Sequence, residues 1–211
     1  MRLVARTALP LALLAALAAG FGGSDKKTTG AEAAPAAQAA CPKAWRAGWQ
    51  RLADRVGVPV YCPAWLPSPL TGRLGGPWNS VLSVGRDRSY LVSFLYREEG
   101  GLEVHVILRG YPGRTRVPTC RSVELVGGRK IEKTVPCFSD RRGTRRVGGV
   151  TVTVYTANRD ADEWHVLYAW RRGRTLYSLS EHVAPPFSTV ARVMRNLDRM
   201  MRSLALVAPR S

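Results

Sequence analysis

Histidines and the polar residues beside them are the side chains of this chain best suited to acid–base chemistry. Ser178, Ser180 and Glu181 precede a histidine, so that a hydroxyl, a carboxylate and an imidazole stand close together, as nucleophilic catalysis requires. Neighbours in a strand point to opposite faces, so Glu181 and His182 should not form a relay. Neither a GxSxG nor an SxxK motif is present. We therefore assign no catalytic residue and expect a structural role for His182. The three histidines are His105, His165 and His182.

The four cysteines are an even number, which in an exported protein favours disulfides over free thiols. They allow three connectivities, and we prefer the pairing of sequence neighbours. It would tie an N-terminal helix to the next strand and close the turn-rich segment around residues 126–128, each loop stabilising by about 3 kcal/mol in the chain-entropy model. Zinc is the alternative, but there is no CxxC and no paired histidine spacing. No phosphate-loop motif is present either, so we predict neither a metal nor a cofactor. The preferred pairs are Cys41–Cys62 and Cys120–Cys137.

The first 40 residues predict export. Arg2 and Arg6 precede an apolar run, residues 7–20, which ends in small residues and is too short for a stable membrane span. The pattern is that of a bacterial lipoprotein leader in which Phe21 replaces the acylated cysteine. We predict a signal peptide over residues 1–20, a flexible linker over 21–40 and one globular domain over 41–208. Cleavage would free the domain, whereas an uncut leader would tether it.

The net charge of +17 makes the chain strongly basic. Its 27 arginines against 5 lysines are typical of a GC-rich genome, so part of the charge reflects codon usage. A basic surface still attracts polyanions, and outside the cytoplasm these are anionic lipids and wall polymers rather than nucleic acid. We expect such a partner and no nucleic acid.

Amphipathic helices are predicted near both ends of the domain. Trp45, Trp49 and Leu52 recur at helical spacing, and Gly57 suits the position after the helix end. A second helix is predicted over residues 189–204 with Ser188 as its N-cap. Opposite its apolar stripe lies a row of arginines that we interpret as a solvated face and, alternatively, as an anion-binding surface. This row is Arg192, Arg195, Arg199 and Arg202.

Alternation of apolar and polar residues predicts strands between the two helices. Residues 89–96 and 102–109 form one expected hairpin, and 163–170 with 176–180 form another. We predict an α+β fold: a curved antiparallel sheet of about six to eight strands, packed by an N-terminal and a C-terminal amphipathic helix and closed by two disulfides. The further strands are predicted at 58–61, 81–84, 130–137 and 147–156.

Residues 41–50, 59–67, 164–170 and 180–186 together resemble a family of uncharacterised secreted lipoproteins of GC-rich bacteria. More loosely, the order of motifs is similar to small extracytoplasmic domains of unknown function on bacterial anti-sigma and sporulation proteins. Neither resemblance brings catalytic residues, and the first implies an anchor that Phe21 cannot carry.

The function we expect is that of an exported, non-catalytic binding module of the cell envelope, either secreted or attached to the outer face of the membrane. The alternatives are an extracytoplasmic hydrolase that uses His182 or His165, and a carrier of a lipid or glycan. A deep apolar cavity would favour the carrier, whereas a carboxylate and an imidazole that converge in a cleft would favour the enzyme.

Overall fold

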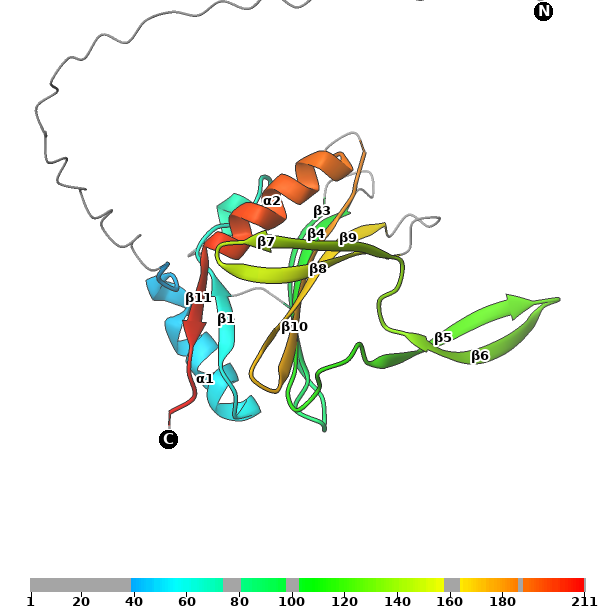
Figure 1. Ribbon diagram of the computed structural model, residues 1–211, viewed down its shortest axis with the longest axis horizontal. Coiled ribbons are helices and arrows are strands. Elements are labelled where there is room, and N and C mark those ends of the chain that lie inside the picture. The colour runs from blue at the N-terminus through cyan, green and yellow to red at the C-terminus, as the bar shows by residue number, and fades with distance from the viewer. Residues whose placement is uncertain (1–38, 74–80, 98–102, 158–163, 186–187, 211) are drawn as a thin grey trace, which may run out of the picture. The chain divides into compact units, whose positions relative to one another are not determined.

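The computed structural model describes residues 39–73, 81–97, 103–157, 164–185 and 188–210. Within them, seven antiparallel strands form one sheet, most of which is labelled in Figure 1. The strand order is β2-β3-β4-β10-β9-β8-β7. Two meanders, β2 to β4 and β7 to β10, meet where β4 pairs with β10. The strands are β2 (Val81–Val84), β3 (Tyr90–Arg97), β4 (Glu103–Tyr111), β7 (Arg141–Val147), β8 (Val150–Ala157), β9 (His165–Arg172) and β10 (Thr175–His182).

Two smaller antiparallel ladders accompany this sheet. β1 (Val60–Pro63) pairs with β11 (Leu204–Val207), and β5 (Thr119–Val126) pairs with β6 (Arg129–Pro136). The helices are α1 (Arg46–Val56), which follows a 3-10 turn at Lys43–Trp45, and α2 (Val190–Arg202); a second 3-10 turn spans Leu70–Arg73.

The core lies on one face of the seven-stranded sheet. Alternate residues of its central strands are buried on that face, and Phe94 and Tyr168, for example, are at most 2% exposed. The apolar stripe of α2 covers the same face, and its central residues Val193 and Leu197 are fully buried. Trp45, at the start of α1, stacks on Phe94 with ring centroids 5.3 Å apart. The two faces of the sheet are therefore unlike, because helices cover only one.

The expectation of a curved sheet is wrong. The sheet is open, and among the described pairings a shift of register occurs only at its edge, between Arg141 and Gly143 of β7. Bulges inside the strands are one source of curvature, and the central ladders run without a register shift.

The expected arrangement of the helices holds only in part. α2 lies against β7, β9 and β10, whereas α1 packs mainly on the β1–β11 ladder. α2 also begins one residue later than expected, because Thr189 and not Ser188 caps it by accepting the N–H of Arg192. After α2 the chain forms β11. This strand was not predicted from the sequence, because Leu204 continues the apolar stripe of the helix.

Both predicted disulfides are confirmed. Cys41–Cys62 ties the chain before α1 to β1, and Cys120–Cys137 closes the base of the β5–β6 hairpin. The predicted signal peptide and all but the end of the linker lie outside the described residues. In the described part of the chain, no helix is long and apolar enough to cross a bilayer. The disulfides favour an oxidising, extracytoplasmic environment.

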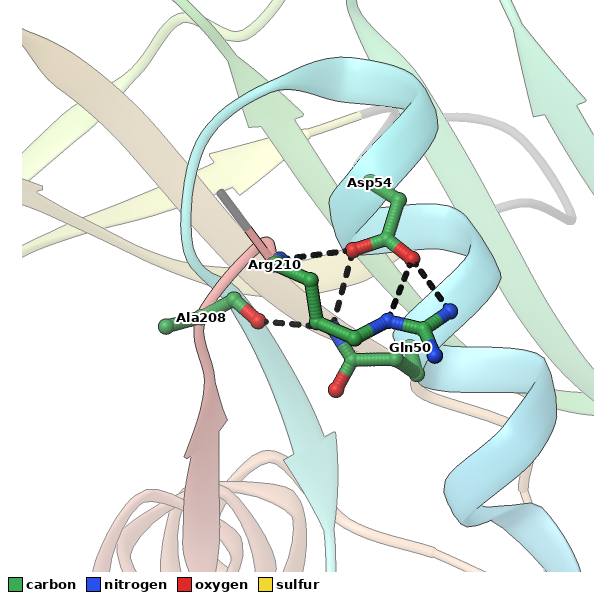
Figure 2. A network of polar contacts seen from close by, with 4 residues as sticks. All are labelled: Gln50, Asp54, Ala208 and Arg210. Atoms are coloured by element: carbon green, nitrogen blue, oxygen red, sulfur yellow. Dashed lines mark hydrogen bonds and ion pairs between the residues drawn. The ribbon is translucent and has the colours of Figure 1, made fainter.

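The chain end is fastened to α1 by a polar network (Figure 2). Arg210 donates its backbone N–H to one oxygen of Asp54 and its guanidinium to the other, over distances of 2.7–3.0 Å. Gln50 bridges Asp54 and the carbonyl of Ala208. These hydrogen bonds lower the pKa of Asp54 to about 2, because they favour its ionised form.

Candidate functional site

The sheet face opposite α2 carries a groove of about 460 Å³. It crosses β3, β4, β10 and β9, and its lining consists of the side chains that alternate with the core residues of these strands. Its floor is mixed: aliphatic side chains lie beside serines and charged groups. The aliphatic residues are Leu91, Leu95, Ile107 and Leu167, and the serines are Ser93, Ser178 and Ser180.

One end of the groove is walled by the segment that follows the β5–β6 hairpin. Phe138 is 4% exposed and packs among Tyr111, Leu167 and Leu176 on this face. Its neighbour Cys137 lines the groove and is bonded to Cys120. The disulfide therefore holds the wall in position.

At the opposite end His105 and His165 line the groove, and His182 packs against both of them. His105, His182 and His165 lie on the neighbouring strands β4, β10 and β9, and His182 pairs directly with His165 in the ladder. The ring centroids are 4.6–5.2 Å apart. Three segments that are distant in sequence thus place their imidazoles in one cluster.

Hydrogen bonds define part of the protonation pattern of this cluster. Nδ1 of His182 is 2.7 Å from the carbonyl oxygen of Glu103, which can only accept, so Nδ1 carries the proton. Nε2 of His105 faces Nε2 of His165 at 2.5 Å, which requires one of the two nitrogens to be unprotonated. Nδ1 of His105 lies 3.0 Å from the Glu103 carboxylate. The cluster can therefore accept or donate a proton inside the groove.

Two arginines of the groove differ in their partners. Arg97 is exposed and forms an ion pair with Glu103 at 2.8 Å. Arg109 is half-buried, and in the part of the chain that the structure describes no carboxylate lies within ion-pair distance of it. An arginine that lines a groove and has no acidic partner can bind an anionic group of a ligand.

Comparison with protein-family models, with curated proteins and with solved structures finds no match. Fold and groove are therefore the basis for any functional conclusion, and the resemblances proposed from sequence stay predictions.

The predicted arginine row of α2 lies far from the groove in the fold, on the helix that covers the other face. All four arginines are exposed, as the amphipathic pattern predicts, and Arg199 lies over the ring of Trp65, 4.3 Å from its centre. Anion binding by this row stays a prediction. The row is Arg192, Arg195, Arg199 and Arg202.

Glu181 and His182 point to opposite faces, which confirms that they form no relay. Glu181 is 2% exposed under α2, where one carboxylate oxygen accepts a hydrogen bond from Asn196 at 2.7 Å. Burial raises the pKa of Glu181 to about 8, although Asn196 and Arg192 oppose this shift.

The described residues contain no group of three or more His, Cys, Asp or Glu side chains arranged to hold a metal ion.

The tryptophans are largely core residues. Trp45, Trp49 and Trp170 are at most 3% exposed, whereas Trp78 lies outside the described residues. Trp164 lines a second, apolar groove of about 540 Å³ between β7 and α2. Both arginines at that groove have acidic partners, Arg142 with Asp140 and Arg145 with Asp198.

Sequence reasoning singled out the histidines, Ser178, Ser180 and the Cys137 disulfide, but it missed Arg109, Glu103 and Phe138. Arg109 and Glu103 carry a usable signal, because both share the polar side of a strand whose other side is apolar. No sequence pattern identifies Phe138, because it belongs to no periodic segment. The disulfide beside it holds it at the groove.

Proposed function

We propose that this protein is an exported binding module of the cell envelope that takes an anionic, partly apolar ligand in the groove. The leader sequence and the disulfides support export, whether the domain is secreted or held at the outer face of the membrane. The groove supports binding because it combines an aliphatic floor with cationic side chains. Its volume, about 460 Å³, is within the usual range of small-molecule sites.

The observation that carries this proposal is the half-buried Arg109 without an acidic partner among the described residues. A guanidinium that is partly removed from water loses hydration, and a ligand carboxylate or phosphate can replace it with two parallel hydrogen bonds. The side chains of Leu91 and Ile107 line the groove near Arg109 and can cover the apolar part of the same ligand. The ligand class is thus an amphiphile with an anionic head.

A titration with octyl phosphate, below its micellar concentration and followed by NMR, tests the proposal. We expect saturable shifts in backbone amides of β3, β4 and β10 and in the imidazoles. Octanol lacks the anionic head, and inorganic phosphate lacks the apolar chain. Each should bind at least about tenfold more weakly than octyl phosphate, since a charged hydrogen bond contributes about 1.5–3 kcal/mol. Shifts on another surface, or equal binding of octanol, would contradict the proposal.

A second candidate is a hydrolase in which His105 activates water. The observation that favours it is the approach of the Glu103 carboxylate to Nδ1 of His105 inside a groove. The imidazole would take a proton from water as its oxygen attacks an ester carbonyl, and the products would be an acid and an alcohol. Against it, Nε2 of His105 faces another imidazole and not a nucleophile.

Hydrolysis of p-nitrophenyl octanoate by wild type and by His105→Asn tests this candidate. An enzyme should lose about 10²–10⁴-fold in rate when its general base is removed. The binding function predicts equal background rates for the two proteins.

A further inference from the structure

The β5–β6 hairpin is exposed on both faces. It forms a two-stranded sheet of its own (Figure 1). Of the five large apolar side chains that are exposed in the described part of the chain, four lie on this hairpin, and Leu125 is the most exposed at 69%. Clustered apolar surface of this kind marks an interaction site, whereas single exposed residues do not. The four are Val123, Leu125, Val126 and Ile131.

The apolar side chains surround the outer half of the hairpin. Val123 and Leu125 share one face, because side chains alternate along β5. Ile131 pairs with Glu124 in the ladder and therefore shares the other face with Val126. A folded partner with a flat surface would cover only one of these faces. Covering all four side chains requires surroundings that enclose the tip.

The hairpin is fixed at both ends. Gly127 and Gly128 form its two-residue turn with φ of 56° and 78°, which glycine adopts without strain. At the base, Cys120 is bonded to Cys137, whose N–H donates to the carbonyl of Pro118. The tip is thus presented by a closed two-stranded ribbon.

Basic side chains accompany the apolar tip. Arg129 and Lys130 follow the turn directly, and Lys133 forms an ion pair with Glu124. Four basic and two acidic side chains lie on the two strands, so the hairpin is net cationic. The six are Arg121, Glu124, Arg129, Lys130, Glu132 and Lys133.

We propose that the tip of this hairpin inserts into the headgroup region of an anionic membrane. The membrane interface encloses a tip from all sides, accepts apolar side chains and attracts the cations beside them. Insertion stays at headgroup depth, because the outer backbone edges of a two-stranded ribbon need water to satisfy their hydrogen bonds. This inference rests on the hairpin alone and is independent of the ligand in the groove.

Hydrogen exchange of residues 119–136 in the whole chain, with and without vesicles of phosphatidylglycerol and phosphatidylcholine, tests the insertion locally. We expect exchange at the tip to slow about fivefold or more with anionic vesicles and to stay unchanged with pure phosphatidylcholine. Because the readout is local, binding by the leader segment does not mimic it. Equal protection by soluble polyphosphate, or no protection by either vesicle, would overturn the proposal.

Matched variants sharpen the test. Leu125→Ser with Val126→Ser should abolish the protection, whereas Leu206→Ser, which removes an exposed apolar side chain in β11, should preserve it. Arg129→Gln with Lys130→Gln should weaken co-sedimentation with anionic vesicles about tenfold. Arg195→Gln with Arg202→Gln on α2 removes the same charge and should have less than a twofold effect. The reverse order of the two charge variants would assign the contact to α2 and overturn the proposal.

Discussion

The histidine cluster depends on register. His105 is 60 residues from His165 and reaches it because β10 lies between β4 and β9 in the sheet. The ladder pairs His182 with His165, and a shift of register by one residue would turn His182 toward the core. The same alternation separates Glu181, which faces α2, from the groove. Two neighbouring residues thus serve different faces of one strand.

Glu181 should make the stability of the fold depend on pH. Burial raises its pKa in the folded protein to about 8, whereas the unfolded chain ionises near 4.5. Between these values the folded state binds more protons, so the free energy of unfolding falls as pH rises from about 4.5 to 8. Each pKa unit corresponds to about 1.4 kcal/mol, which sets an upper limit of about 5 kcal/mol. We expect Glu181→Gln to remove most of this fall between pH 5 and pH 9 in urea unfolding.

An exposed carboxylate provides the control for this measurement. Glu124 is about half exposed in an ion pair with Lys133, and Glu124→Gln should leave the pH dependence as in wild type, because exposed pairs contribute little. If Glu181→Gln and wild type lost stability equally between pH 5 and pH 9, the buried carboxyl would not be the cause.

Sequence alone could identify the histidines as chemically interesting but could not bring them together. Their convergence depends on the pairing of β4 with β10, which joins two meanders that are separate in the chain. Sequence did indicate that Glu181 and His182 point apart, since alternation is local. Arg109 was not singled out, because its significance lies in the absence of an acidic neighbour in the described structure.

At the scale of elements, the second disulfide links the hairpin to the groove. Cys120→Ser with Cys137→Ser should lower the free energy of unfolding by about 3 kcal/mol in the chain-entropy model. It should also weaken octyl phosphate binding, because the segment that carries Phe138 loses its attachment to β5. Urea unfolding and calorimetric titration measure the two effects.

The first disulfide is the matched control. Cys41 and Cys62 close a loop of similar length, 21 residues against 17, on the far side of the core. Their double substitution by serine should cost similar stability and leave the groove affinity within twofold of wild type. An equal loss of affinity in both double variants would show that the wall does not depend on its own disulfide.

Strands with one buried face were predictable, whereas of the two exposed strands of the hairpin only β6 was predicted and β5 was missed. β3 alternates cleanly because Tyr90, Val92 and Phe94 enter the core. β7 holds four arginines at the sheet edge and β5 is exposed on both sides, so neither shows an apolar period. β11 was not predicted, and its first residue, Leu204, was assigned to the helix, because the pairing of β11 with β1 is a tertiary effect that local spacing does not record.

At the scale of the whole molecule, the two faces of the main sheet have different roles. α2 and the β1–β11 ladder with α1 bury one face of the sheet, and the groove and its wall occupy the other face. The leader predicted export, the chain length predicted one folded domain and the even number of cysteines predicted two disulfides; of these, the disulfides are confirmed. The absence of curvature in the sheet was not predictable, because the alternation of apolar and polar residues carries no information about curvature.

The affinity of Arg109→Gln for octyl phosphate tests the binding function most directly. Calorimetric titration of wild type, Arg109→Gln and the control Arg146→Gln, which removes an exposed charge on β7, compares proteins that differ in one side chain. We predict about a tenfold or greater loss for Arg109→Gln and less than a twofold change for Arg146→Gln. Equal affinities of wild type and Arg109→Gln would contradict the assignment of the groove as the ligand site.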